Sequence, residues 1–468
     1  MCLSASNSSE RLQKPPRLVS NGDYGGGPRL RKLPFLCLLS CTLLSAQQAP
    51  IPAATALSGN PFFIKKTWTI GGTGNWDYLT ADPGARRLYI AHGNSVQVVD
   101  LDSGSPAGEI RGFRQAHAIA LDDTGEFGYV SDGPAGEVKV FNRRSLAVEA
   151  TIPIFCVPRS IAFEPQSKLV FAVCGASGGA PQTPTPNRGA PPQTLRPTSG
   201  SANASRSSNR PEQTNTSGTS HVVAIDAETR TVLADMAMLG DFRFALPDGN
   251  GHVYISVGPA EYSVVQNGRT ARSFVPPRIA RLDATAIAGE AHRQQPASAA
   301  VPNAGVLLDW TVHTIPDSLG HFMQLRSTCA NPQGLAIDSR HLRLFAACDD
   351  RQFVVLDSDS GNVIATMTTG PGDDVLGFDE DHGLIFIANG AGYGSLTIVS
   401  QDATTDSYAV IQNLPTQEHA RTLAVDASSG QVYLVTDFNG VDLTQAGGIG
   451  SLKTASIPGS FHVLVVGH

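Results

Sequence analysis

Residues 117–131 read His117-Ala118-Ile119-Ala120-Leu121-Asp122, then a turn, then Phe127-Gly128-Tyr129-Val130-Ser131. A polar residue opens a short apolar run, an acidic residue closes it, and a second apolar run follows the turn. Short β-rich runs bounded by turn residues predict two antiparallel strands. The phrase occurs seven times along the chain, and its copies begin at Asp77, His117, Arg159, Arg243, Gln333, Asp374 and Arg421.

The copies recur at a regular interval. Their first residues are separated by 40, 42, 84, 90, 41 and 47 positions, and we interpret the two doubled intervals as repeats that carry insertions. Most copies continue with a third strand that ends in Asp or Asn, residues suited to a tight turn because their side chains bond the backbone two residues later. Examples are Val96–Asp100, Val138–Asn142, Val222–Asp226 and Phe353–Asp357. A fourth β-rich run, such as Val148–Ile152, completes the unit.

Four short strands repeated every forty residues or so predict an all-β fold, a seven-bladed β-propeller with four-stranded antiparallel blades. One such sheet cannot bury both its faces alone, so the blades must stack around an axis. The run Phe461–Val466 would be the third strand of the last blade, and Phe63–Ile70 would be its outer strand. Pairing the two ends of the chain in one sheet removes an exposed edge. A β-sandwich with coincidental spacing is the alternative.

Three phrases carry a family resemblance: Leu88–Ala91, Val98–Asp100 and Leu356–Gly361. They resemble the forty-residue repeats of the YVTN β-propeller family, and residues 61–468 as a whole look like its YncE-like exported bacterial branch. The resemblance implies the propeller fold. For function it implies binding roles, including DNA binding in one relative, and links to redox or metal physiology. The long insertions depart from the compact form of that family.

Composition narrows the class of protein further. Gly and Pro together make up 78 of 468 residues, and 41% of the chain is hydrophobic, which excludes a charged coiled coil and a wholly disordered chain. The formal net charge of −7 argues against a globally basic nucleic-acid binder.

The amino-terminal region has the parts of an export signal. Arg29, Arg31 and Lys32 precede an apolar run at 33–46, which is too short for a membrane-spanning helix. We expect cleavage near Ala46 and a periplasmic or secreted protein, with lipidation at Cys41 as an alternative. The predicted organisation is an export region at 1–46 that includes a doubtful extension before Arg29, a linker at 47–60, and a propeller at 61–468 with no transmembrane segment.

The insertions fall mainly on one face of the predicted propeller. Residues 175–220 are rich in Ser, Thr, Pro, Gly and Asn, so we expect a disordered insert between the second and third strands of the third blade. The segments Gly258–Pro277 and Ile315–Asn331 should lengthen loops on that same face. The stretch Gly289–Gly305 should project from the opposite face.

Four cysteines remain after the export region, as expected for an oxidising compartment. Cys156 and Cys174 flank a predicted hairpin, and Cys329 and Cys348 occupy nearly the same places two blades later. We therefore predict two intrablade disulfides, Cys156–Cys174 and Cys329–Cys348. Zinc binding and unpaired buried thiols are the alternatives, although the sequence has no Cys-x-x-Cys motif among these four cysteines.

The seven residues that open the repeats form the candidate site. Asp77, His117, Arg159, Arg243, Gln333, Asp374 and Arg421 should meet where the inner strands open onto the axis, and the second strands should end nearby at His92, Asp132, Asp349, Asn389 and Asp437. Three Arg and one His favour a small anionic ligand or a protein partner. Mutual pairing of the seven groups without any ligand is the alternative structural role.

We expect a monomeric binding or scaffold protein, with no metal and no other cofactor predicted. A nucleic-acid partner is a weaker alternative. A propeller enzyme of the lactonase or quinoprotein type, using Asp77, His117 and Arg159, is the alternative function. The chain has no Gly-x-Ser-x-Gly, Walker, His-Glu-x-x-His or Cys-x-x-Cys-His motif that would support it.

Overall fold

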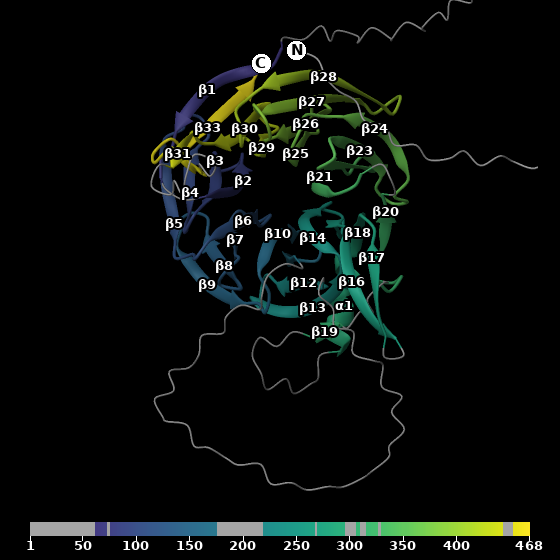
Figure 1. The fold of residues 1–468 in the computed structure, drawn as a ribbon. Helices are drawn as coiled ribbons and strands as arrows, with labels where there is room; N and C mark the ends of the chain where they lie inside the picture. Colours follow the sequence, from purple (N-terminus) through teal and green to yellow (C-terminus); the bar gives the residue numbers. More distant parts are fainter. Residues whose placement is uncertain are drawn as a thin grey trace, which may run out of the picture. The chain divides into compact units, whose positions relative to one another are not determined.

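Seven sheets, each built on four antiparallel strands, form a ring around a central axis (Figure 1). The computed structural model describes residues 61–72, 75–175, 219–266, 269–294, 306–308, 315–325, 329–442 and 453–468. The ring confirms the seven-bladed β-propeller predicted from the repeat, and both doubled intervals are single blades with insertions.

Each blade contributes four strands, numbered here from the axis outward. Blade 1 consists of β2 (Trp76–Asp82), β3 (Arg87–His92), β4 (Ser95–Asp100) and β5 (Pro106–Arg111), and blade 2 of β6 (Ala116–Leu121), β7 (Phe127–Asp132), β8 (Glu137–Asn142) and β9 (Val148–Pro153). Blade 3 contains β10 (Pro158–Glu164), β11 (Leu169–Cys174), β12 (Thr219–Asp226) and β13 (Thr231–Leu239). Blade 4 contains β14 (Asp241–Pro247), β15 (His252–Gly258), β18 (Arg278–Asp283) and β20 (Gly320–Gln324). Blade 5 is β21 (Pro332–Asp338), β22 (Arg343–Cys348), β23 (Gln352–Asp357) and β24 (Val363–Thr368); blade 6 is β25 (Asp373–Asp379), β26 (Leu384–Asn389), β27 (Ser395–Asp402) and β28 (Ser407–Pro415); blade 7 is β29 (Thr422–Asp426), β30 (Gln431–Thr436), β33 (His462–Gly467) and β1 (Phe63–Thr69).

The two ends of the described chain close the ring in blade 7. Strand β1 pairs antiparallel with β33, with Phe63 opposite Gly467 and Thr69 opposite His462. Strand β33 pairs in turn with β30. The outer strand of the last blade therefore comes from the start of the propeller, as the sequence predicts.

The ring has two faces, which we name from the inner strands. The funnel face is the end at which the seven inner strands begin, and the turn face is the end at which they finish. Two hairpins extend from connections at the funnel face: β16 (Ala260–Gln266) with β17 (Arg269–Val275), and β31 (Asn439–Asp442) with β32 (Lys453–Ser456). Helix α1 (Ala284–Gln294) and β19 (Val306–Leu308) lie between β18 and β20, on the connection that leaves the turn face. Strand β19 pairs parallel with β13 and so adds a fifth strand to the outer edge of blade 3.

Two details of the predicted insertions change. The segment 315–331 is not simply a loop, because it contains β20, the outer strand of blade 4. Strand β12 begins at Thr219, inside the range predicted for the insert. The predicted export region and linker at 1–60, and the insert residues 176–218, lie outside the described residues.

Seven clusters of buried hydrophobic side chains form the core between the blades, one at each interface between neighbours. A small eighth cluster packs Leu239 against Tyr262 and Val275 of the β16–β17 hairpin. Because each blade is covered on both faces, its inner and middle strands read as continuous apolar runs. Strand β11 is buried at every position, from Leu169 to Cys174.

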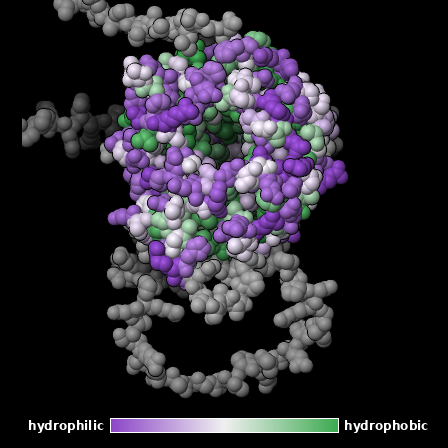
Figure 2. All heavy atoms as spheres, turned by 180° about the vertical axis from the view of Figure 1, so that it is seen from behind, coloured by the Kyte–Doolittle hydropathy of each residue, from purple (hydrophilic) through white to green (hydrophobic). Residues whose placement is uncertain are grey.

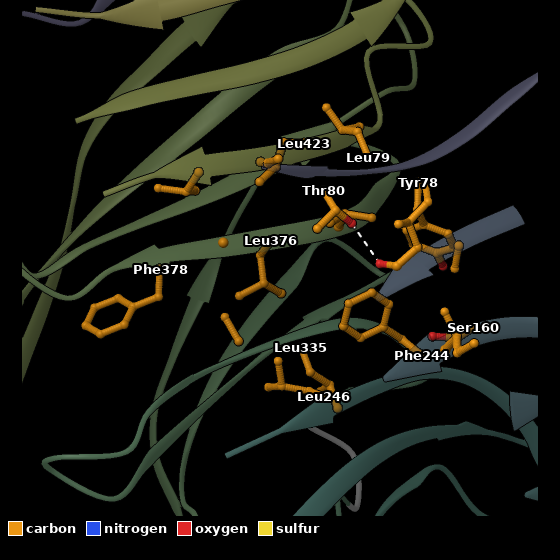
Figure 3. Close-up of a pocket in the computed structure, with 18 of the residues that line it drawn as sticks. Tyr78, Leu79, Thr80, Ser160, Phe244, Leu246, Leu335, Leu376, Phe378 and Leu423 are labelled. Atoms are coloured by element: carbon orange, nitrogen blue, oxygen red, sulfur yellow. Dashed lines mark hydrogen bonds between the residues drawn. The ribbon is translucent and has the colours of Figure 1, made fainter. Parts of the chain in front are cut away.

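A channel lies on the axis and is lined by all seven inner strands. Its walls are largely apolar, and its volume is about 330 Å³. Figure 2 shows a central hollow with hydrophobic walls inside a mostly hydrophilic surface. The rings of Tyr78 and Phe244, from blades 1 and 4, lie 5.6 Å apart in this channel, and Thr80 donates a hydrogen bond to the carbonyl of Ile119 (Figure 3).

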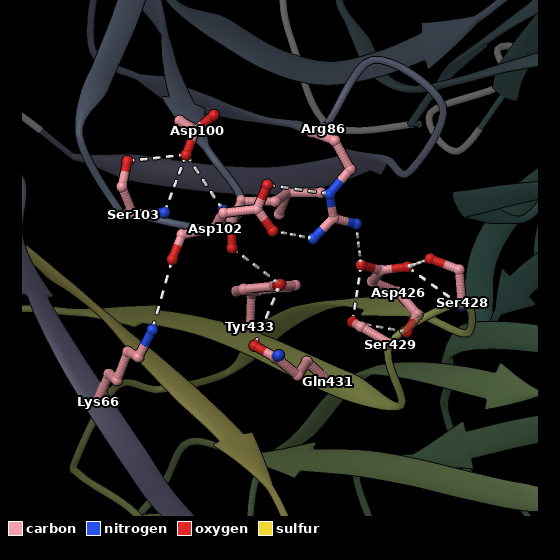
Figure 4. Close-up of polar contacts among 11 residues, drawn as sticks. Lys66, Arg86, Asp100, Asp102, Ser103, Asp426, Ser428, Ser429, Gln431 and Tyr433 are labelled. Atoms are coloured by element: carbon pink, nitrogen blue, oxygen red, sulfur yellow. Dashed lines mark hydrogen bonds and ion pairs between the residues drawn. The ribbon is translucent and has the colours of Figure 1, made fainter.

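Acidic residues end or directly follow all seven inner strands at the turn face: Asp82, Asp122, Glu164, Asp248, Asp338, Asp379 and Asp426. Each carboxylate accepts a backbone N–H from the turn that follows it. Cations also bridge the blades here. Arg86 of blade 1 contacts Asp426 of blade 7 at 2.8 Å and Asp102 at 2.6 Å, beside the contact of Lys66 with the Asp102 carbonyl (Figure 4). This network reinforces the closure between the first and last blades.

Candidate functional site

The residues that open the repeats sit in β-bulges. In blades 1 to 6 the register of the inner strand against its neighbour shifts at the position of the predicted site residue. In blade 1, for example, the shift falls between Trp76 and Leu79 and leaves Asp77 unpaired in the ladder. A bulge turns an extra side chain away from the regular alternation of the strand. Arg421 directly precedes β29 and occupies the same end of blade 7.

Small residues on the second strands leave room for these side chains. A Cβ atom added at Gly175 would lie 2.9 Å from Nε of Arg159, and one added at Gly258 would lie 3.2 Å from Nε of Arg243. The guanidinium groups therefore lie across the funnel-face ends of β11 and β15. Any larger residue at these glycines would push them away.

Four of the predicted site residues form two pairs across neighbouring blades. Nδ1 of His117 lies 2.5 Å from Oδ2 of Asp77. Nε of Arg421 lies 3.6 Å from Oδ2 of Asp374. In both cases a cationic or ionisable group of one blade faces the carboxylate of the adjacent blade.

Asp241 is a further member of the site that the sequence analysis did not identify. Its two carboxylate oxygens contact two arginines from different blades, Arg159 at 3.4 Å and Arg243 at 2.8 Å. Its only signal in the sequence is its place two residues before the opening residue of the fourth repeat.

Asp349 joins the site from the end of the second strand of blade 5. It accepts hydrogen bonds from Gln333 at 2.7 Å and from Asn331 at 2.5 Å, and it lies 3.9 Å from Nη1 of Arg243. Three other predicted strand ends have local roles: Asp132 accepts hydrogen bonds from the loop that enters β6, Asn389 donates to Asp373, and His92 contacts Gln97.

One cavity of about 500 Å³, here called the funnel cavity, collects part of this set. Four of the seven predicted residues line it, together with Asp349, Asp373 and the loop 390–392: these four are Arg243, Gln333, Asp374 and Arg421. Asp77, His117 and Arg159 are not in its lining. The site is therefore asymmetric and lies towards blades 4 to 7.

The electrostatics show how closely the groups converge. Withdrawal from bulk water raises the pKa of Asp374 to about 6, with Asp77 and Asp349 adding to the rise and Arg421 and Arg243 partly offsetting it. Burial likewise raises the pKa of its neighbour Asp373 to about 7, although Thr369 and Asn389 donate hydrogen bonds to it. Burial thus favours the protonated form of both carboxyl groups, and protonation of Asp374 would leave Arg421 less neutralised.

The structure contains both disulfides predicted from the sequence, Cys156–Cys174 and Cys329–Cys348, each joining the loop that enters an inner strand to the end of the next strand. Within the described ranges, no group of three or more His, Cys, Asp or Glu side chains could hold a metal ion. The helical part of the described chain includes no segment long and apolar enough to cross a membrane.

The fold is similar to two solved structures, one of U3-55K and one of the WD40 repeats of RRP9. Each comparison has a TM-score of 0.52 at 8% sequence identity, and 85% of this chain covers 97% of the U3-55K chain and 96% of the RRP9 chain. At this identity the likeness shows the propeller fold alone. No family model and no curated protein matches the sequence.

Proposed function

We propose that this chain is a non-catalytic, exported binding protein of the YVTN type, whose funnel face binds an acidic group of a small ligand or of a protein partner. The two disulfides support export, because such bonds persist in oxidising compartments. The phrases of the forty-residue repeat support the family.

The single observation that carries the proposal is the combination of the funnel cavity with an exposed aromatic residue at its edge. Tyr393 is 97% exposed and follows directly on Ala391 and Gly392, which line the cavity. A fully exposed aromatic side chain contributes nothing to the core, and aromatic residues are enriched in protein interfaces.

Other exposed aromatic residues lie on connections of the same face. Four of the five exposed Phe and Tyr residues among those described are there, namely Phe155, Phe274, Tyr393 and Phe438. The fifth, Phe63, begins the outer strand of blade 7. A partner on the funnel face would therefore meet apolar contacts around a polar centre.

Charge supports an acidic group in that centre. Arg159 and Arg243 share one carboxylate, Asp241, and Arg421 remains half exposed beside Asp374. Protonation of Asp374 near pH 6 would leave Arg421 without its counter-ion. Guanidinium groups bind carboxylates and phosphates through two parallel hydrogen bonds.

A random peptide library displayed on phage tests the proposal. We expect wild-type protein to enrich peptides that combine Asp or Glu with apolar residues. A synthetic peptide of the selected sequence should lose about tenfold or more in affinity for Arg421→Gln, equivalent to about 1.4 kcal/mol. Tyr393→Ala should weaken the same peptide.

Arg340→Gln is the matched control, since Arg340 is an exposed arginine paired with Glu380 on the turn face. It should bind the peptide as the wild type does. Equal binding by Arg421→Gln, or selection of peptides without acidic residues, would contradict the proposal.

The alternative, an enzyme, is favoured by one observation, the close contact of His117 with Asp77. A carboxylate beside a histidine orients and strengthens a general base. The enzyme hypothesis predicts turnover of lactones or esters that is lost in both Asp77→Asn and His117→Ala. The binding proposal predicts unchanged peptide affinity in these two variants and no turnover.

A further inference from the structure

A second cavity of about 420 Å³ lies between blade 7 and blade 1, next to the funnel cavity. Asn75 and Trp76 of blade 1 form one wall, and the base of the β31–β32 hairpin forms another through Asn439 and Ser456. Blade 7 supplies the remaining lining residues, His419, Arg421 and Asp437. Only Arg421 and His419 also line the funnel cavity.

The lining contains two buried polar groups that lack partners. Asp437 is only 3% exposed, and neither of its carboxylate oxygens has a hydrogen-bond partner among the described residues. The buried Nε1 of Trp76 likewise has no hydrogen-bond partner within the described part of the chain. An unpaired carboxylate in the interior is strongly unfavourable unless a cation or several donors meet it.

The equivalent residue of blade 2 shows what Asp437 lacks. Asp132 also follows a buried hydroxyl residue at the end of a second strand, and it is equally buried. Its two oxygens accept the backbone N–H groups of Arg114 at 2.9 Å and Gln115 at 3.0 Å, in the loop that enters β6. The fold therefore provides this carboxylate with two donors in blade 2.

In blade 7 the corresponding donor points elsewhere. The N–H of His419, which occupies the position of Gln115, bonds the carbonyl of Gly390 in blade 6 at 2.8 Å. The loop thus bonds blade 6 and leaves Asp437 beside the cavity without the donors that Asp132 has.

Donors lie on the same cavity. The side chain of Arg421 is 51% exposed, and its contact with Asp374 is long at 3.6 Å. Trp76 adds an N–H. Phe438 and Ile457, joined by a backbone hydrogen bond of 2.8 Å, are exposed at the base of the hairpin. An acceptor for a cation, donors for an anion and an exposed apolar pair thus occur within one small region.

We propose that this cavity binds an ammonium group adjacent to a carbonyl or carboxylate, the chemistry shared by a free α-amino acid and the amino terminus of a peptide. The ammonium group donates to Asp437, and the neighbouring oxygen accepts from Trp76 and Arg421. An apolar side chain on the ligand would extend towards Phe438 and Ile457. The site goes beyond the acidic group proposed for the funnel, and its test uses Asp437 and Trp76, which that proposal does not involve.

Isothermal titration calorimetry of the full chain with four probes tests the site: L-leucine, L-leucinamide, the peptide Leu-Gly-Gly and N-acetyl-L-leucine. The first three carry the ammonium group and at least one of them should bind, whereas the acetylated probe should not. Binding of L-leucine alone identifies a free amino acid as the ligand. Binding of leucinamide and Leu-Gly-Gly identifies a peptide amino terminus.

Variants locate the binding. Asp437→Asn should weaken the bound probe at least about tenfold, as expected when a buried charge pair loses one member, and Trp76→Phe should weaken it less. Asp132→Asn is the matched control and should leave affinity unchanged. A second readout separates ligand binding from folding: without ligand, Asp132→Asn should lower the melting temperature, and Asp437→Asn should not.

Three results would overturn the site. One is the absence of saturable binding by every ammonium-bearing probe. Another is binding of N-acetyl-L-leucine to the wild type as tight as that of an ammonium-bearing probe, or binding of a probe to Asp437→Asn as tight as its binding to the wild type. The third is a fall in melting temperature for Asp437→Asn as large as that for Asp132→Asn, which would assign Asp437 to internal structure held by water. None of these results would affect the peptide selection that tests the funnel.

Discussion

The turn face and the funnel face are built from opposite ends of the same seven inner strands, yet their polar residues differ in kind. At the turn face all seven positions are acidic, and every carboxylate accepts a backbone N–H from its own turn. At the funnel face the seven residues are of four types, Asp, His, Arg and Gln. Six of them contact a charged or ionisable side chain of a neighbouring blade, and Gln333 contacts Asp349 of its own blade.

The difference is the one we expect if the turn face serves the architecture and the funnel face is the proposed binding surface. A repeated turn makes the same demand seven times, so one residue type suits every copy. No repeated backbone demand explains why Asp77, Arg243 and Gln333 differ at equivalent places. Unlike residues at equivalent positions, set in bulges beside cavities, are what a single asymmetric ligand requires.

The largest effect on stability should come from the turn face. Arg143 is 11% exposed and bridges Asp82 of blade 1 at 2.5 Å and Asp122 of blade 2 at 3.2 Å. Arg143→Ala would leave both buried carboxylates without their cation, and we expect a loss of about 3–5 kcal/mol in the free energy of unfolding. Urea denaturation measures it.

Arg144→Ala is the control for that substitution, because the adjacent arginine is exposed. It should change stability by less than about 0.5 kcal/mol. Similar losses for the two variants would show that the bridge between blades 1 and 2 is not what stabilises this face.

The next effect should come from the covalent links, which both lie at the funnel face. Each disulfide closes a loop with a sequence separation of 18 or 19 residues. Replacing both cysteines of either pair with serine should lower the free energy of unfolding by about 3 kcal/mol. Peptide mapping without reductant should recover both linked pairs from the wild type, and recovery of four free thiols would contradict the prediction.

The features that sequence analysis predicts are those set by local chemistry. Apolar runs such as Leu344–Cys348 are buried on both faces of a blade, and the acidic residue after an inner strand binds its own turn, so both leave a repeated pattern. The closing strands Phe63–Thr69 and His462–Gly467 follow from the same reasoning, because a ring needs no free edge.

The features it missed depend on contacts between distant parts of the chain. Asp241 belongs to the site because two arginines 84 positions apart, Arg159 and Arg243, both reach it. Asp437 lacks partners because the loop at His419 bonds blade 6. Short β20 escaped notice within 315–331. Helix α1 had a local signal in the sequence, because Asp283 caps it by accepting the N–H of Ala286 at 2.7 Å. An Asp at this position also ends the third strand of other blades, where a turn follows instead of a helix.

A smaller effect on stability should come from the pH dependence of a buried carboxyl group at the funnel face. Burial raises the pKa of Asp373 to about 7, above the value near 3.8 expected in the unfolded chain. The native state therefore holds this proton more tightly, so its contribution to stability is fully present at low pH and is lost as pH rises through 7. From pH 6 to pH 8 the loss should be about 1.4 kcal/mol.

Asp373→Asn should remove this part of the pH dependence, measured as the difference between urea denaturation at pH 6 and pH 8. The control is Asp402→Asn, because hydrogen bonds from Thr405 and Thr404 lower the pKa of that exposed carboxyl and it does not titrate in this window. An unchanged pH dependence in Asp373→Asn would show that Asp373 is ionised normally in the folded protein.

The smallest effect on stability should come from the funnel arginines, and it sharpens the contrast with Arg143. Arg243 contacts Asp241 at 2.8 Å, but both side chains are partly exposed, and Asp241 keeps Arg159 when Arg243 is removed. Arg243→Gln should therefore change the free energy of unfolding by no more than about 1 kcal/mol. The same variant should weaken the peptide selected on the wild type, since Arg243 lines the funnel cavity. A loss of stability as large as that of Arg143→Ala, with peptide affinity intact, would mean that the funnel residues pair for structural reasons, as the acids of the turn face do.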